Sequence, residues 1–324
     1  MNDERRRTAG TASRPAGDRG ETVSSDVIED RLDSARPADA GVRPASPAAR
    51  AEFAPDLGVL RAMSTAVPGA LPIAVNGIRV AASIRPRKFV IAGGDDMPVT
   101  MPRTAFQVVY PDCTAMIDGG LDKTTHDSFS PDKPEPYFPE AFAKLARALD
   151  AARLIVVTHF HADHVAGILS AANFTDLARK TIIASETARC LVETPHRPHL
   201  KLSPEAVAHF IVLDYPAYYP VAPGIVLIKA PGHSPDSQMV FIRLQSGREI
   251  LHSVDSAWIM DNILELKGKA APWVKEDVPA IMAQLRWLKR VHETDKNVTI
   301  LVTHDDKHFD ALAEAGKIGN ELKL

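Results

Sequence analysis

Three histidines and one aspartate lie within six residues of this chain, at His159, His161, Asp163 and His164. Ionisable side chains at this density repel or desolvate one another unless a cation compensates them. Imidazole and carboxylate together suit zinc, and iron and manganese accept the same ligands. We therefore expect a metal site here, with zinc as the first choice.

The spacing within this cluster predicts two neighbouring metal positions. His159 and His161 are two residues apart at the end of an extended stretch, so their side chains leave the backbone on the same side and can share one metal. Asp163 and His164 are adjacent on a tight turn into a helix. They diverge enough to face a neighbouring position.

Regular elements must hold the cluster in place. The apolar run 154–158 predicts a strand covered on both faces, and a helix is expected to follow at 162–172. Further strands are expected at 73–80, 88–92, 104–110, 114–117, 181–184, 211–213, 225–230, 238–244, 249–254 and 298–303. Further helices are expected at 139–151, 186–193, 278–292 and 309–315. Such groups of strands with helices between some of them favour an α/β architecture with helices covering the sheets.

The segment 159–164 resembles the His-x-His-x-Asp-His hallmark of the metallo-β-lactamase superfamily, and four more residues resemble that family's other motifs in the same order. Asp118, in an Asp-Gly-Gly turn, is similar to an upstream aspartate that orients ligands. His233 in Pro-Gly-His-Ser is similar to the third ligand of the first metal. Asp255 is similar to the bridging carboxylate, and His304 to the last ligand of the second metal.

This resemblance covers about 70–318 and implies an α/β fold, the four-layer αββα metallo-β-lactamase sandwich. It implies two Zn²⁺ ions per chain, with iron or manganese as possible substitutes. The metal ligands that it implies are His159, His161, Asp163, His164, His233, Asp255 and His304, with Asp118 hydrogen-bonded behind them. The implied reaction is hydrolysis of a carboxylic ester or lactone by a metal-bridging hydroxide, with Asp163 orienting the nucleophile and passing a proton to the leaving group.

Three enzyme groups within the superfamily have motifs similar to those of this chain, and the similarity differs among them. The Pro-Gly-His-Ser-Pro and Thr-His-Asp motifs around His233 and His304 are most similar to acyl-homoserine lactonases, although Asp236 stands where glycine is usual and Ala230 where threonine is usual. A glyoxalase II-like thioesterase is the first alternative, weakened because few residues follow His304. A mononuclear-iron sulfur (persulfide) dioxygenase is the second.

Two groups of residues before His233 are candidates for contact with substrate. Tyr215, Tyr218 and Tyr219 could cover an acyl chain, but ordinary half-buried aromatics are the preferred interpretation. His196 and His199 lie in a proline-rich loop, and similar loops border the substrate pocket in the superfamily. We nevertheless expect surface or core roles for both histidines.

Composition sets the remaining expectations. Residues 1–52 are rich in Arg, Asp, Ala and Pro and predict a disordered tail, 53–69 a linker or short helix, and 70–324 the hydrolase domain. The net charge of −3 disfavours nucleic acid as a partner. No long apolar run or apolar signal region is found, so we expect no membrane partner and a cytoplasmic location, with export left open. The expected partner is a small-molecule ester, lactone or thioester, and a homodimer is possible.

Overall fold

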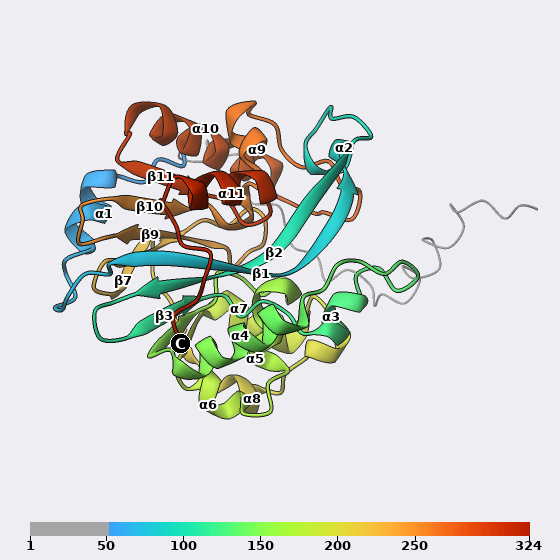
Figure 1. The fold of residues 1–324 in the computed structure, drawn as a ribbon, viewed down its shortest axis with the longest axis horizontal. Helices are drawn as coiled ribbons and strands as arrows, with labels where there is room; N and C mark the ends of the chain where they lie inside the picture. The colour runs from blue at the N-terminus through green and yellow to red at the C-terminus, as the bar shows by residue number, and fades with distance from the viewer. Residues whose placement is uncertain (1–51) are drawn as a thin grey trace, which may run out of the picture. The chain divides into compact units, whose positions relative to one another are not determined.

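Two β-sheets form the centre of residues 52–324, the part of the chain that the computed structural model describes (Figure 1). The predicted tail at 1–52 lies outside the described residues except for its last position. The six-stranded sheet has the order β1 (Ala74–Pro86), β2 (Pro98–Val109), β3 (Thr114–Ile117), β4 (Leu154–Val156), β5 (Thr181–Ala184) and β6 (Ile211–Leu213). The five-stranded sheet has the order β11 (Val298–Leu301), β10 (Glu249–His252), β9 (Gln238–Arg243), β8 (Ile225–Lys229) and β7 (Tyr218–Ala222).

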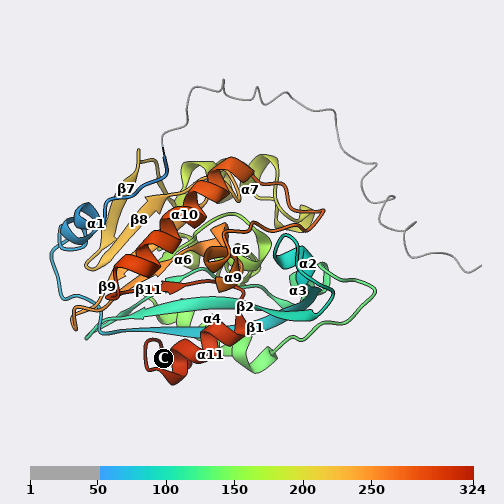
Figure 2. The ribbon, with the colours of Figure 1, turned by 90° about the horizontal axis from the view of Figure 1, so that it is seen from above.

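Alternate side chains of each strand enter different layers. In β8, Ile225 and Leu227 face the core between the two sheets, whereas Val226 and Ile228 pack in the core on the outer face. That outer core is completed by α1 (Leu57–Met63), α9 (Met260–Leu264) and α10 (Val278–Thr294), and Figure 2 shows α1 and α10 beside this sheet.

The other outer face carries a second set of helices. Residues of α4 (Pro139–Ala151), α5 (Ala162–Leu169), α6 (Phe174–Ala178), α7 (Ser185–Glu193) and α8 (Pro204–Val207) pack there against the six-stranded sheet. The described residues therefore form the expected four αββα layers. The short elements α2 (Arg87–Val90), α3 (Lys123–Asp127), η3 (Pro198–Leu200), η4 (Val254–Ser256) and α11 (Asp306–Glu314) lie in the connections and near the C-terminus.

The predicted strand at 88–92 is wrong. These residues form α2 and a following turn, because Val90 packs with Met101 and Trp258 in a small separate core. The next strand begins earlier than expected, at Pro98, and includes Pro102. This part of β2 pairs only with β1, so the missing N–H of Pro102 interrupts no central ladder.

Two other segments were more ordered than expected. The strand β7 and the helix α3 form in segments for which the sequence predicted no regular element. Asp56 caps α1 by accepting hydrogen bonds from the Gly58 and Val59 amides. No helix within residues 52–324 has the length and apolar character needed to cross a bilayer.

Candidate metal centre

The cluster 159–164 lies where β4 ends and α5 begins. His161 is the residue before the first turn of α5, and Asp163 and His164 lie in that turn. Asp118 directly follows β3, which pairs in parallel with β4 through Ile117 and Val156. Because parallel neighbours end at the same edge of a sheet, Asp118 and the cluster are brought together.

Asp118 is hydrogen-bonded to Thr158 and His164, at the two ends of the ligand-bearing turn. It has φ of 65°, a left-handed conformation that is uncommon outside glycine but that aspartate and asparagine adopt more often than other residues. Its carboxylate accepts hydrogen bonds from the Thr158 amide at 2.8 Å and hydroxyl at 2.9 Å, and from His164 Nδ1 at 2.8 Å. These contacts fix both the turn and the ring of His164.

Helix α5 can approach this turn because Gly167 has no side chain. A Cβ on Gly167 would lie 2.1 Å from the Gly119 carbonyl oxygen. The Gly167 amide instead donates to the Gly120 carbonyl at 3.0 Å, and the Gly119 amide donates to the His164 carbonyl at 2.7 Å.

The five-stranded sheet supplies the other three residues. His233 lies in the turn between β8 and β9, Asp255 lies in η4 after β10, and His304 follows β11. Val254 has φ of 51°, an unusual value for a β-branched residue, so the strained backbone beside Asp255 sets its direction. Gln238 joins the two sheets here, because its side-chain amide donates to the Val157 carbonyl at 2.7 Å.

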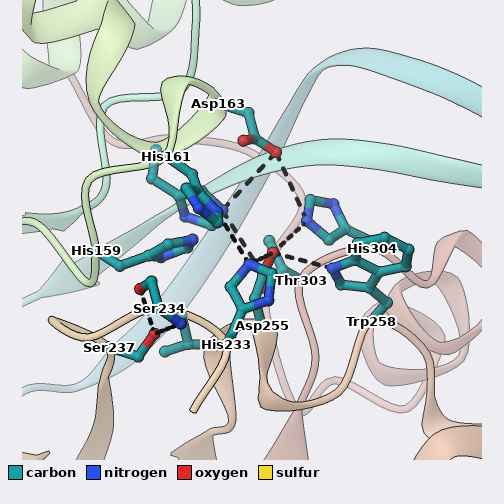
Figure 3. A network of polar contacts seen from close by, with 12 residues as sticks. His159, His161, Asp163, His233, Ser234, Ser237, Asp255, Trp258, Thr303 and His304 are labelled. Atoms are coloured by element: carbon teal, nitrogen blue, oxygen red, sulfur yellow. Dashed lines mark hydrogen bonds and ion pairs between the residues drawn. The ribbon is translucent and has the colours of Figure 1, made fainter. Parts of the chain in front are cut away.

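The structure brings all seven predicted ligand residues into one cluster, in which His161 is half-buried and the others are buried. Three groups of ligand atoms each lie within 4.8 Å of one another: His159, His161 and His233; Asp163, His164 and His304; and His159, His164 and Asp255. In Figure 3 the Asp255 carboxylate lies between the rings of His233 and His304, with Nε2 distances of 3.3 Å and 3.2 Å. Asp255 is thus shared between the first two groups, as a bridging ligand requires.

Hydrogen bonds fix the outer nitrogen of three histidine rings. Nδ1 of His164 donates to Asp118, Nδ1 of His304 to the Pro102 carbonyl at 2.7 Å, and Nδ1 of His233 contacts Glu276 at 2.5 Å. Each contact leaves Nε2 directed inward. This is the arrangement in which metal-binding histidines are held by partners behind them.

Three inward-facing atoms have no hydrogen-bond partner among residues 52–324: His159 Nε2, His164 Nε2 and Asp255 Oδ1. An unsatisfied buried polar atom costs about 1–3 kcal/mol. The three residues form one of the groups described above, so cations bound within this cluster would satisfy all three atoms. Imidazole nitrogen and carboxylate oxygen are a donor set that fits zinc.

Burial and charge set the protonation of the cluster. Burial, with help from neighbouring imidazoles, lowers the pKa of His159 and His161 well below the ordinary value, so both rings are neutral. Burial also opposes charge on His164, but Asp118, Asp163 and Asp255 outweigh it and raise the His164 pKa. For Asp163, burial is outweighed by Arg103, His164 and His304, which lower its pKa.

Several residues around the ligands were not identified from the sequence. The Arg103 guanidinium forms an ion pair with Asp163, and Trp258 Nε1 donates to Asp255 Oδ2 at 3.1 Å. Lys269 Nζ lies 2.7 Å from Glu276 Oε1, behind His233. These residues are distant in sequence from the ligands and belong to no motif, so no local signal indicates them.

His196 and His199 have different positions. The His196 ring lies 4.4 Å from the His161 ring, and its Nδ1 accepts from the Ala162 amide at 3.0 Å, so it borders the site. We expected a surface or core role for His196, but the residue lies beside the candidate metal centre. His199 is exposed and contacts the Thr125 hydroxyl.

The three tyrosines have other partners. The Tyr215 hydroxyl contacts Gln238 Oε1 at 2.5 Å, and the Tyr218 hydroxyl accepts from the Asp56 amide. Tyr219 is exposed and stacks near Tyr215. Tyr215 is buried, Tyr218 half-buried and Tyr219 exposed, and their contacts are those of ordinary structural aromatics.

Sequence comparison finds relatives over part of the chain. No protein-family model matches it. An N-acyl homoserine lactonase from Bacillus thuringiensis is 24% identical over 157 residues, which are 47% of this chain and 55% of that protein. The chain thus spans about half the length of the curated relatives that it matches.

Structural comparison covers more of the chain. An N-acyl homoserine lactone hydrolase, solved with the product N-hexanoyl-L-homoserine at its catalytic metal centre, is 18% identical with a TM-score of 0.56, over 74% of this chain and 96% of that one. AidC, a dizinc quorum-quenching lactonase, is 14% identical with a TM-score of 0.53, over 72% of this chain and 91% of that one. These likenesses show a shared fold.

Proposed function

We propose that this chain, which has the metallo-β-lactamase fold of those hydrolases, is a dinuclear metal-dependent hydrolase of lactones or carboxylic esters. The observation that carries the proposal is the pair of neighbouring ligand groups, His159, His161 and His233 in one and Asp163, His164 and His304 in the other, with the Asp255 carboxylate beside both. The lactonase relative and the product-bound lactone hydrolase support the substrate class.

Each side chain has a proposed role in this account. His159, His161 and His233 would hold the first metal, Asp163, His164 and His304 the second, and Asp255 both, with zinc as the proposed metal. When bound, two zinc ions would lower the pKa of a shared water and polarise the substrate carbonyl.

The neighbouring residues would position these ligands. Trp258 and the Glu276–Lys269 pair hold Asp255 and His233 in place. Asp163 is the proposed catalytic residue, because its buried carboxylate lies 3.8 Å from His164 Nε2 and 3.7 Å from His304 Nε2, where it would orient the nucleophile and pass a proton to the leaving oxygen.

A metal and substrate screen tests the proposal. The purified chain is analysed for metal and then assayed with an N-acyl homoserine lactone, a thioester and a persulfide, before and after chelation and zinc return. We expect about two zinc ions per chain and chelator-sensitive lactone hydrolysis. Preferred thioester cleavage would support the glyoxalase II-like alternative, and one iron per chain with oxygen uptake would support the dioxygenase.

Three further expectations remain proposals. We propose a small-molecule substrate without a nucleic-acid or membrane partner, a cytoplasmic location, and a homodimer as a possible state. Sedimentation analysis of the zinc-loaded chain tests the last, and fractionation of the source cells tests the location.

A further inference from the structure

Two guanidinium groups flank one side of the proposed metal centre. Arg103 and Arg197 lie over the Phe129 ring, at 4.7 Å and 4.1 Å from its centroid. Arg103 pairs with the proposed ligand Asp163, and Arg197 follows His196, whose ring stacks on His161. Arg103 therefore contacts a proposed metal ligand directly, and Arg197 lies against the same Phe129 ring as Arg103.

Arg197 forms no close ion pair among the described residues, although the Asp163 carboxylate attracts its charge from a distance. Its Nε donates to the Ser128 hydroxyl at 3.2 Å and its Nη1 to the His196 carbonyl at 3.0 Å, and both of these acceptors are neutral. The side chain is half-buried, and desolvation lowers its pKa. A half-buried charge without a counter-ion is unfavourable, unless a ligand supplies the opposite charge.

Arg103 is only partly compensated as well. Its exposed fraction is 11%, and within residues 52–324 its buried Nε has no hydrogen-bond partner and its single carboxylate partner is Asp163. Its Nη2 donates to the Ser83 hydroxyl at 3.0 Å. The nearby Glu135 carboxylate is already paired with Arg85 and bonded to the Ile84 amide. If Asp163 binds a divalent cation, little negative charge remains for Arg103.

We propose that the substrate carries a carboxylate, which Arg197 and Arg103 bind on the Phe129 side of the metal centre. The planar guanidinium matches a carboxylate through paired N–H donors. This inference rests on the proposed hydrolase function and narrows it to anionic lactones or esters. The charge pattern thus favours a substrate unlike an N-acyl homoserine lactone with a plain alkyl chain.

Matched lactones test the preference. The zinc-loaded protein is assayed with N-succinyl homoserine lactone, which has a terminal carboxylate, and with the neutral N-pentanoyl homoserine lactone of similar length. We expect kcat/KM to be about tenfold or more higher for the succinyl compound, the effect of one charge-assisted hydrogen bond. Arg197→Gln should remove this ratio, Arg197→Lys should retain part of it, and Arg189→Gln on the exposed face of α7 should keep it.

Binding measurements keep this test separate from the hydrolase proposal. Calorimetry with the two corresponding lactams, whose rings resist hydrolysis, reports carboxylate recognition even if neither lactone is turned over. Equal dissociation constants in the wild-type protein, or a preference that survives in Arg197→Gln, would overturn the inference. Tighter binding of a phosphonate analogue than of the succinyl lactam would overturn the assignment to a carboxylate.

Discussion

The carboxylate of Asp236 accepts a hydrogen bond at 2.7 Å from the amide of Phe160, the residue between His159 and His161. Asp236 also accepts from the Thr187 hydroxyl at 2.7 Å and from the Ser234 hydroxyl at 2.6 Å. Ser234 follows His233 in the chain. One buried side chain therefore ties together the two loops that carry the first group of histidines.

Replacing Asp236 should weaken the first metal position. In Asp236→Ala the Phe160 amide loses its acceptor and both loops relax, so we expect zinc affinity to fall about tenfold to a hundredfold. Competition with a fluorescent chelator measures this change. Asp214→Ala, at an exposed carboxylate before β7, is the control and should bind zinc like the wild type. An unaltered affinity in Asp236→Ala would show that the loops hold their shape without it.

Replacing Asp118 should affect the second metal position. Asp118→Ala removes the acceptor of His164 Nδ1 and of two Thr158 groups, so the His164 ring loses its orientation. We expect zinc content after dialysis to fall from about two ions towards about one, and the free energy of unfolding of the metal-free protein to fall by about 1–3 kcal/mol. Asp112→Ala, on the exposed turn between β2 and β3, is the matched control.

Lys269 should contribute strongly to stability. Its side chain is 1% exposed, and its ammonium group pairs with Glu276, whose side chain is 5% exposed. Lys269→Met leaves a buried carboxylate without its cation, and we expect urea denaturation of the metal-free protein to show a loss of about 3–5 kcal/mol. The exposed Lys123–Asp127 pair provides a contrast, because Lys123→Met should change stability by less than about 1 kcal/mol. Equal losses in the two variants would contradict this reasoning.

Zinc affinity should weaken as the pH falls. Asp118, Asp163 and Asp255 overcome the effect of burial and raise the His164 pKa, so the metal-free protein takes up a proton on His164 as the pH drops through that pKa. Zinc needs the neutral ring and must displace this proton, which costs about tenfold in affinity per pH unit below the pKa. His159 and His161 add no such competition, because burial lowers their pKa.

A titration with competing chelator from about pH 9 to about pH 6 measures this dependence. Above the raised His164 pKa the affinity should become nearly independent of pH. A constant affinity over the whole range would mean that no ligand histidine is protonated in the metal-free protein.

Much of the ligand set could be predicted because each ligand lies after an apolar strand. Such a strand can be recognised from the few consecutive residues that form it. His159, Asp118 and His304 come directly after buried runs, and strand ends meet at one edge in a layered fold. Elements with weak local patterns were missed. The run around Val90 looks like a strand but is drawn into a turn of helix by Trp258, which is distant in sequence.

The supporting residues could not be predicted for a related reason. A role for Arg103 and Glu276 can be assigned only from their contacts with Asp163 and His233. These contacts join residues that are distant in sequence and exist only in the folded chain. Asp236 did carry a signal, because it stands where glycine is usual, but its hydrogen bonds to both histidine loops depend on the packing of β4 against β9.

Anomalous diffraction at the zinc absorption edge, from crystals of the zinc-loaded protein, tests the central claim most directly. The account predicts two peaks, one among His159, His161 and His233 and one among Asp163, His164 and His304, with Asp255 between them. A single peak, or an iron signal in place of zinc in crystals of protein purified without added metal, would contradict the dinuclear zinc centre.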